Sequence, residues 1–348
     1  MATPREYRLA LRRALEEERL HAVVLLYCMG AEQVPRDFAQ AIIEEYDGTK
    51  PLVVAMLGGA ETAEAVKLLN RAGIAAYTEP EEAVRALASL YHWKSYRDRP
   101  ARAGEPELEV DWAGIEEVIA RAWAEGRLQL LEPEVREILE LVGLEVPEYR
   151  VARSLKEALQ AGEELGYPLV LKAISEEIIH KTEAGGIRLN LRSQEELRGA
   201  YEEMVAAVGR SYPRAPLRGV LVTGFITGGV EAIIGASRDP SFGPTVMFGL
   251  GGIYVEVLKD VVFRVAPLSR EEAREMIGQI RSAALLRGVR GEPRKDIAAL
   301  GEALYRLAAL VARVQEISEL DINPLRVMPE GEGCLVLDAR MTISEVRR

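Results

Sequence analysis

The stretch FGPTVMFGLGGIYVEV, residues 242–257, sets the prediction for the second half of this chain. Its four glycines lie around one apolar run and just before another. Glycine lets backbone N–H groups approach a phosphate because no side chain obstructs them. The run after the glycines is patterned as a strand and not as a helix, so the stretch matches neither a P-loop nor a dinucleotide-binding fingerprint. Two interpretations stand: a loop that contacts phosphate, or tight turns between neighbouring strands.

Further strand patterns surround this stretch. Several strands are predicted between residues 219 and 248, and two more at 321–327 and 334–337. Helical spacing of apolar residues predicts helices at 270–281 and 296–317 between them. Runs of neighbouring strands, expected to be antiparallel, are typical of an α+β region.

Lys172 lies inside the apolar strand pattern LVLKA, residues 169–173. An unpaired buried ammonium group is costly, so this lysine must either reach solvent or meet an anion. The sequence therefore leaves two roles open: a phosphate ligand, or a lysine on an edge strand.

His180 lies in SEEIIHKTEAGGI, residues 175–187, between two predicted strands. Neutral imidazole is a competent nucleophile near pH 7, and the pair Gly185-Gly186 could act as a flexible joint. A phosphate carrier and an ordinary surface histidine are both consistent with this pattern.

Oxygen-bearing side chains mark the two last strands. Asp321 and Asn323 alternate in ELDINPLRV, residues 319–327, so they face the same side of a strand, and Asp338 ends the next strand. Carboxylate and amide oxygens suit Mg²⁺, which shares such ligands with phosphates. The alternative is turn chemistry, since Asp and Asn favour strand ends.

The first 95 or so residues have a different pattern. Apolar runs at 21–29, 51–57 and 74–77 alternate with helical segments. Such alternation predicts a small doubly wound α/β domain with a parallel sheet. The polar, proline-containing stretch 94–109 is predicted to be an exposed linker.

Composition excludes several classes of protein. A formal net charge of -11 argues against nucleic acid as a main partner. No apolar run approaches the roughly 20 residues that a membrane span needs. The two cysteines, Cys28 and Cys334, are too few and too far apart for a disulfide framework or a zinc site, so a reducing cytoplasm is expected.

Together these stretches resemble the ATP-grasp part of the NDP-forming acyl-CoA synthetases, which are relatives of succinyl-CoA synthetase and of ADP-forming acetyl-CoA synthetase. The matching stretches, in the family's order, are GYPLVLKAIS, IIHKTEAGGIRLNL, SRDPSFGPTVMFGLGGIYVEVLKDVVFRVAPLS, LLRGVRG, ELDINPL and LDAR. The stretches TPREYRLALRRALEEERLHAVVLLY and GIAAYTEPEEAVRALASLYHWKSY resemble a CoA-ligase-type flavodoxin-like domain without its initial strand. The resemblance implies this flavodoxin-like domain over residues 1–97, a linker and helix over 98–124, and a two-lobed ATP-grasp domain over 125–348, with lobes of about 125–222 and 223–348.

The resemblance also implies roles for single residues. Lys172 would hold nucleotide phosphates, and Asn323 and Asp338 would bind Mg²⁺. Asp321 would lie beside a phosphohistidine, and His180 matches a histidine proposed to ride on a swinging loop. The other residues expected to bind nucleotide are Gly249, Gly251 and Gly252 near the phosphates, Glu231 near the ribose, and Thr223 and Phe225 between the lobes.

Two further points concern binding. Thr223-Gly224 stands where the family usually has an acidic residue that approaches the adenine, which leaves the base preference open. Arg264, Arg287 and Arg290 are candidates for phosphate or interface contacts.

The activity implied by the resemblance is acyl-CoA + ADP + phosphate ⇌ acid + ATP + CoA, through a phosphohistidine. The family's CoA-binding domain and the domain with its principal phosphohistidine have no counterpart in this sequence. We therefore expect a separate alpha-type subunit as partner and a hetero-oligomeric assembly. Two alternatives are a regulatory nucleotide-binding module without catalysis, and a self-contained ATP-grasp carboxylate–amine ligase.

Overall fold

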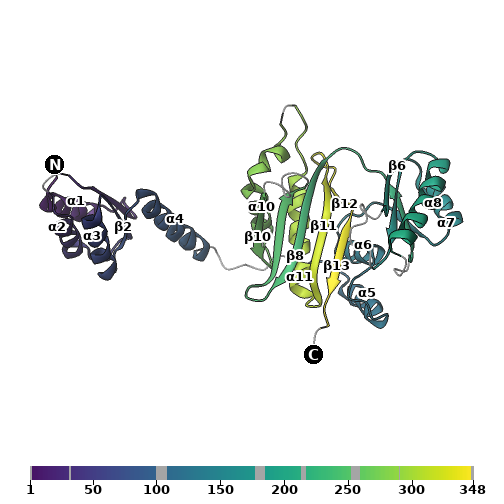
Figure 1. Ribbon diagram of the computed structural model, residues 1–348, viewed down its shortest axis with the longest axis horizontal. Helices are drawn as coiled ribbons and strands as arrows, with labels where there is room; N and C mark the ends of the chain where they lie inside the picture. Colours follow the sequence, from purple (N-terminus) through teal and green to yellow (C-terminus); the bar gives the residue numbers. More distant parts are fainter. Residues whose placement is uncertain are drawn as a thin grey trace. The chain divides into compact units, whose positions relative to one another are not determined.

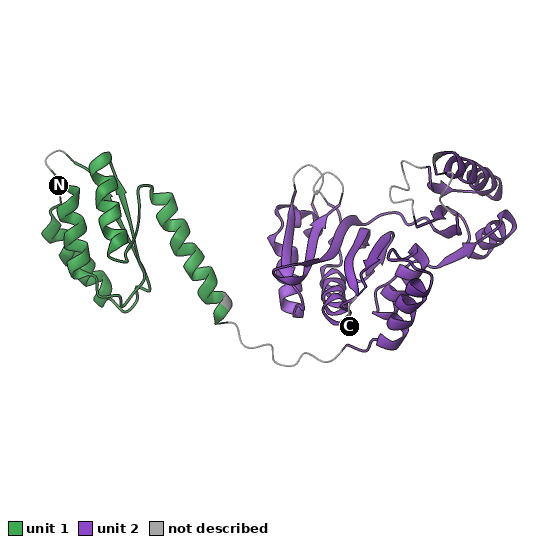
Figure 2. Ribbon diagram, turned by 60° about the horizontal axis from the view of Figure 1, so that its bottom comes forward, with its two compact units in different colours: residues 1–103 green, residues 104–348 purple. Residues whose placement is uncertain are grey.

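The computed structural model describes residues 2–30, 33–98, 108–176, 185–212, 217–251, 259–289 and 291–345. The chain divides into two compact units, residues 1–103 and residues 104–348, which Figure 2 draws in green and purple. Each unit has hydrophobic clusters of its own.

The first unit is built on a three-stranded parallel sheet in the order β1-β2-β3. The central strand is buried almost throughout, because helices cover both of its faces. Val54 and Met56 face one cluster, which includes Phe38. Val53 and Ala55 face the other side and pack against Ala83 of α4. The bounds are β1 (Val23–Cys28), β2 (Leu52–Leu57), β3 (Ala75–Tyr77), α1 (Pro4–Glu16), α2 (Pro35–Glu45), α3 (Ala60–Arg71) and α4 (Pro80–Arg97). The predicted doubly wound α/β arrangement is confirmed.

The second unit contains two antiparallel sheets (Figure 1). The larger sheet has the strand order β10-β9-β8-β11-β12, and β13 also pairs with β11. The smaller sheet has the order β4-β7-β5-β6. The expected antiparallel pairing of this region is therefore confirmed. The bounds are β4 (Tyr149–Ala152), β5 (Leu169–Ile174), β6 (Ile187–Leu191), β7 (Gly219–Gly224), β8 (Val230–Asp239), β9 (Gly243–Leu250), β10 (Val261–Val265), β11 (Ile317–Val327), β12 (Cys334–Val336) and β13 (Ala339–Ile343).

Helices cover the two sheets separately. Two helices pack on the smaller sheet, and the others share one core with the larger sheet (Figure 1). Side-chain oxygens of Ser154, Ser193, Ser269 and Asp296 cap the first turns of four of them, which fixes where these helices begin. The bounds are α5 (Trp112–Ala124), α6 (Glu132–Leu141), α7 (Leu155–Leu165), α8 (Gln194–Ser211), α10 (Arg270–Gln279), the 3-10 helix η1 (Arg281–Arg287) and α11 (Ile297–Arg313).

One boundary differs from the sequence-based expectation. The polar stretch predicted as a linker from residue 94 begins later, because α4 continues to Arg97 and Lys94 pairs with Asp98 one turn on. Helix α5 buries Ile115 and Val118 in the core of the second unit. Among the helices of the described ranges, none has both the length and the apolar content needed to cross a membrane.

Candidate functional site

Lys172 joins the two sheets of the second unit. It lies in β5, whose side chains are buried along the whole strand. Its Nζ donates to Asp338 Oδ1 at 2.7 Å, to the Leu337 carbonyl oxygen at 2.7 Å and to Glu132 Oε1 at 2.8 Å. A lysine has three N–H donors, so this ammonium group is saturated. The lysine therefore meets anions, and the edge-strand interpretation is wrong because β5 lies between β7 and β6.

Asp338 and Asn323 lie next to each other on the larger sheet. Leu337 and Asp338 connect β12 to β13, and the Asn323 N–H donates to the Asp338 carbonyl oxygen at 3.0 Å. The Asn323 side chain is exposed, and the Asp338 side chain is 15% exposed. The structure thus brings together Lys172, Asp338 and Asn323, which lie far apart in the sequence.

Asp321 is partly buried two residues before Asn323. Its backbone is paired with Arg340 of β13 on one side and with Gly235 of β8 on the other. Burial raises the pKa of the Asp321 carboxyl, and the charges of Asp338 and Glu319 act in the same direction, while Arg340 opposes them. A Cβ added to the facing Gly235 would lie 3.2 Å from the Leu320 carbonyl oxygen, so close packing against the β11 backbone favours glycine there.

Two residues of α6, Glu132 and Arg136, were not among the predicted site residues. Glu132 Oε1 accepts from Lys172 and also from Arg136 Nε at 3.1 Å and Nη2 at 3.0 Å. The Arg136 side chain has no exposed area, and its Nη2 also donates to the Leu337 carbonyl oxygen at 2.9 Å. The sequence signal for this pair is the spacing of four residues between Glu132 and Arg136 in α6.

The glycine-rich stretch begins inside a strand. Gly249 belongs to β9 and is paired with Ile233 and Val261. The Gly251 N–H donates to the Glu231 carbonyl oxygen at 2.8 Å, and a Cβ added to Gly251 would lie 3.1 Å from Glu231 Cβ. Gly251 is therefore required, at least in part, by close packing against β8.

The remaining predicted residues are distributed as follows. The Glu231 carboxylate accepts from Arg326 Nη2 at 2.9 Å. Thr223 Oγ1 donates to the Glu148 carbonyl oxygen at 2.8 Å, so its hydroxyl group already has an intramolecular partner. The Phe225 N–H donates to the Pro168 carbonyl oxygen at 2.9 Å, which ties the end of β7 to β5. His180, Gly252 and Arg290 lie outside the described residues.

Two family models match the chain. An ATP-grasp domain model matches residues 121–343, and a Ligase-CoA domain model matches residues 2–99. Subunit beta of the ADP-forming acetate–CoA ligase I from Pyrococcus furiosus is 45% identical over 231 residues, which is 66% of this chain and 98% of that subunit. The chain belongs to the ADP-forming acyl-CoA ligase family. Subunit alpha of the same Pyrococcus enzyme is 44% identical over 100 residues, or 28% of this chain and 22% of that subunit.

A longer relative matches nearly the whole sequence. The ADP-forming 4-hydroxybutyrate–CoA ligase from Nitrosopumilus maritimus is 36% identical over 334 residues, which is 95% of this chain and 47% of that protein. The present chain thus spans about half the length of the relatives that match it along most of its sequence.

A solved relative has the same fold over about two thirds of the chain. The acetyl-coenzyme A synthetase 1 of Ca. Korarchaeum cryptofilum, in complex with coenzyme A and Ca-AMPCP, has a TM-score of 0.64 and 44% identity over 66% of this chain and 99% of that chain. Another structure of that synthetase holds Mg-AMPPCP, with its phosphohistidine segment pointing towards the nucleotide-binding site, at a TM-score of 0.58 and 41% identity over 66% of this chain and 100% of that chain.

Proposed function

We propose that this chain is the nucleotide-binding part of an ADP-forming acyl-CoA synthetase, which catalyses acyl-CoA + ADP + phosphate ⇌ acid + ATP + CoA. One observation is the main support: Lys172 of the smaller sheet and Asp338 of the larger sheet lie 2.7 Å apart, with Asn323 adjacent to Asp338. An ammonium group beside hard oxygen ligands is the combination that a magnesium-bound phosphate chain requires.

The residues present fit Mg²⁺ by their chemistry. Asp338 offers a carboxylate and Asn323 an exposed amide oxygen, and Mg²⁺ prefers one or two such ligands together with phosphate oxygens. When bound there, Mg²⁺ would offset negative charge on the phosphates. Lys172 would bind and orient a phosphate oxygen from the opposite sheet.

His180 is proposed as a carrier of the phosphoryl group. An acyl phosphate first passes its phosphoryl group to the principal phosphohistidine, proposed to lie outside this chain; a P–N bond replaces the P–O bond and the carboxylate leaves. That P–N bond is then replaced by a P–N bond to His180, and the latter by a P–O bond to the terminal oxygen of ADP, which frees the His180 imidazole. Asp321, whose pKa is raised by burial, lies near the nucleotide site and would contact the phosphohistidine.

The CoA-binding domain and the principal phosphohistidine are proposed to come from sequence outside this chain. Pyrococcus furiosus has separate alpha and beta subunits, whereas the Nitrosopumilus relative is about twice as long as this chain. Our proposal is a separate alpha-type subunit and a hetero-oligomer. Copurification of this chain with such a subunit from its source would support that arrangement, and a single longer polypeptide in its place would refute it.

The nucleotide-binding role is tested by calorimetry on the full chain. We expect saturable one-to-one binding of ADP that strengthens when Mg²⁺ is added, and loss of this binding in Lys172→Met. The carrier role is tested with terminally labelled ATP, which should label wild-type protein with an acid-labile, alkali-stable phosphate that is missing from His180→Ala. If wild-type protein does not bind ADP, the proposed function is wrong.

A further inference from the structure

Two buried cations on different elements share the same two acceptors. Glu132 Oε1 accepts from Lys172 Nζ and from Arg136 Nε and Nη2. The Leu337 carbonyl oxygen accepts from Lys172 Nζ at 2.7 Å and from Arg136 Nη2 at 2.9 Å. Both acceptors are therefore fixed from two directions, by β5 and by α6.

The three hydrogen bonds of Lys172 differ in their surroundings. The Glu132 side chain is 2% exposed and belongs to the rigid start of α6. Leu337 contributes a backbone carbonyl group, which cannot turn away independently of the chain. The Asp338 side chain is 15% exposed, against 2% for Glu132, and Asp338 is also the proposed metal ligand. A ligand can therefore replace Asp338 on the ammonium group more easily than it can replace the other two acceptors.

We infer that Glu132 and Arg136 are positioning residues for Lys172. Glu132 and the Leu337 carbonyl oxygen accept two of its N–H donors, Arg136 holds both of these acceptors in place, and the third donor, now on Asp338, can move to a phosphate oxygen. This inference rests on the proposed nucleotide-binding function. Asp338 serves as a substitute for the phosphate as long as no nucleotide is bound, and releasing it also makes its carboxylate available to a metal ion.

Arg136 has a distinct part in this arrangement. Glu132 and Asp338 are two carboxylates beside one ammonium group, and without a second cation both would draw on the charge of Lys172. Arg136 neutralises Glu132, so that the charge of Lys172 remains available to the ligand. Among the described residues, Arg136 Nη1 has no hydrogen-bond partner, so burying this guanidinium group costs free energy, which the Tyr149 ring at 5.2 Å from Cζ offsets in part.

The test compares a ligand that has phosphates with one that lacks them. The affinity for ADP in the presence of Mg²⁺ is measured by calorimetry, and the affinity for adenosine by ligand-observed NMR, with the full chain. In Glu132→Gln we expect affinity for ADP to fall about tenfold, because a charge-assisted hydrogen bond to Lys172 becomes a neutral one. Adenosine affinity should stay within about twofold, since adenosine has no phosphate for Lys172 to bind.

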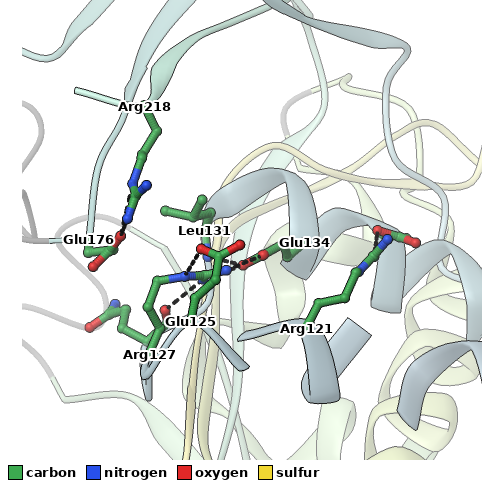
Figure 3. A network of polar contacts seen from close by, with 9 residues as sticks. Arg121, Glu125, Arg127, Leu131, Glu134, Glu176 and Arg218 are labelled. Carbon is green, nitrogen blue, oxygen red and sulfur yellow. Dashed lines mark hydrogen bonds and ion pairs between the residues drawn. The ribbon is translucent and has the colours of Figure 1, made fainter. Parts of the chain in front are cut away.

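A matched control lies on the same helix. Glu134 accepts from Arg127 Nη1 at 2.7 Å and Nη2 at 2.6 Å, and the pair is largely buried (Figure 3). The hydrogen bonds of Lys172 go instead to Glu132, Leu337 and Asp338. Glu134→Gln should lower the melting temperature but leave the affinities for both ligands within about twofold. If Glu132→Gln does not fold, Glu132→Asp keeps the charge while withdrawing the carboxylate by one methylene group, and the same selective loss is expected.

The outcomes separate the two proposals. Selective loss of affinity for ADP in the Glu132 variant supports positioning. An unchanged affinity for ADP, or an equal loss for ADP and adenosine, means that Glu132 is merely structural and overturns the inference while the proposed function stands. Absence of ADP binding by wild-type protein overturns both.

Discussion

Replacing Arg136 by methionine is the most informative test of the buried charges around Lys172. The cluster contains two cations, Arg136 and Lys172, and two anions, Glu132 and Asp338. Removing Arg136 leaves two carboxylates with one ammonium group. The Arg136 side chain has no exposed area, so water does not compensate for the lost charge there. Breaking a buried ion pair by removing one partner costs about 3–5 kcal/mol. We expect a loss near the lower end, about 3 kcal/mol, because Glu132 keeps Lys172 at 2.8 Å.

A surface pair on neighbouring helices provides the comparison. Arg121 Nη2 lies 2.6 Å from Glu137 Oε2, and the two side chains are 57% and 44% exposed (Figure 3). Because exposed ion pairs contribute about 0–1 kcal/mol, Arg121→Met should cost no more than that. The two variants remove the same type of side chain and differ in burial.

The assay must report on the second unit alone, since a chain with two units need not unfold in a single step. Trp112 and Trp123 pack against the core of the second unit, whereas Trp93 is exposed on α4 of the first. Tryptophan fluorescence during urea unfolding, in a Trp93→Phe background, therefore follows the second unit.

A second substitution should restore part of the stability that Arg136→Met loses. Adding Glu132→Gln to Arg136→Met removes one anion with the cation and should recover part of the lost stability. A loss below about 1 kcal/mol for Arg136→Met, or a double variant that is less stable than Arg136→Met, would refute our account of the cluster.

Three further predictions concern the site and its support. Asp338→Ala should abolish the increase in ADP affinity that Mg²⁺ produces, which calorimetry with and without a chelator measures. His180→Ala should leave the affinity for ADP within about twofold yet block transfer of labelled phosphate, and normal transfer would contradict its proposed role. Burial by itself raises the pKa of Asp296, but N–H donors that include Gly331 and Gly333 outweigh it and hold the pKa below 3.8. The stabilisation is therefore present at neutral pH and is lost as pH falls below 3.8 through the lowered pKa, so urea unfolding should find Asp296→Asn less stable than wild type at pH 7 and the difference smaller near pH 2.

Much of the architecture could be predicted from local sequence patterns. The alternation of apolar runs with helical segments gave a parallel sheet covered on both faces, and β1 to β3 have that arrangement. The strand patterns after residue 219 gave neighbouring antiparallel strands. These features follow from side-chain periodicity, which a chain encodes within a few residues.

For the candidate site, the sequence decides less and the tertiary structure decides more. That Lys172 must either reach solvent or meet an anion follows from the sequence alone, because an unpaired buried charge is costly. Which anions it meets does not, since Glu132 lies 40 residues away and Asp338 lies 166 residues away. Pairing across such separations is decided by how helices and sheets pack, and no local pattern records it. The tertiary structure also determined that the Thr223 hydroxyl group donates to the Glu148 carbonyl oxygen and that Arg136 is fully buried. Both features depend on contacts between segments that lie far apart in the sequence.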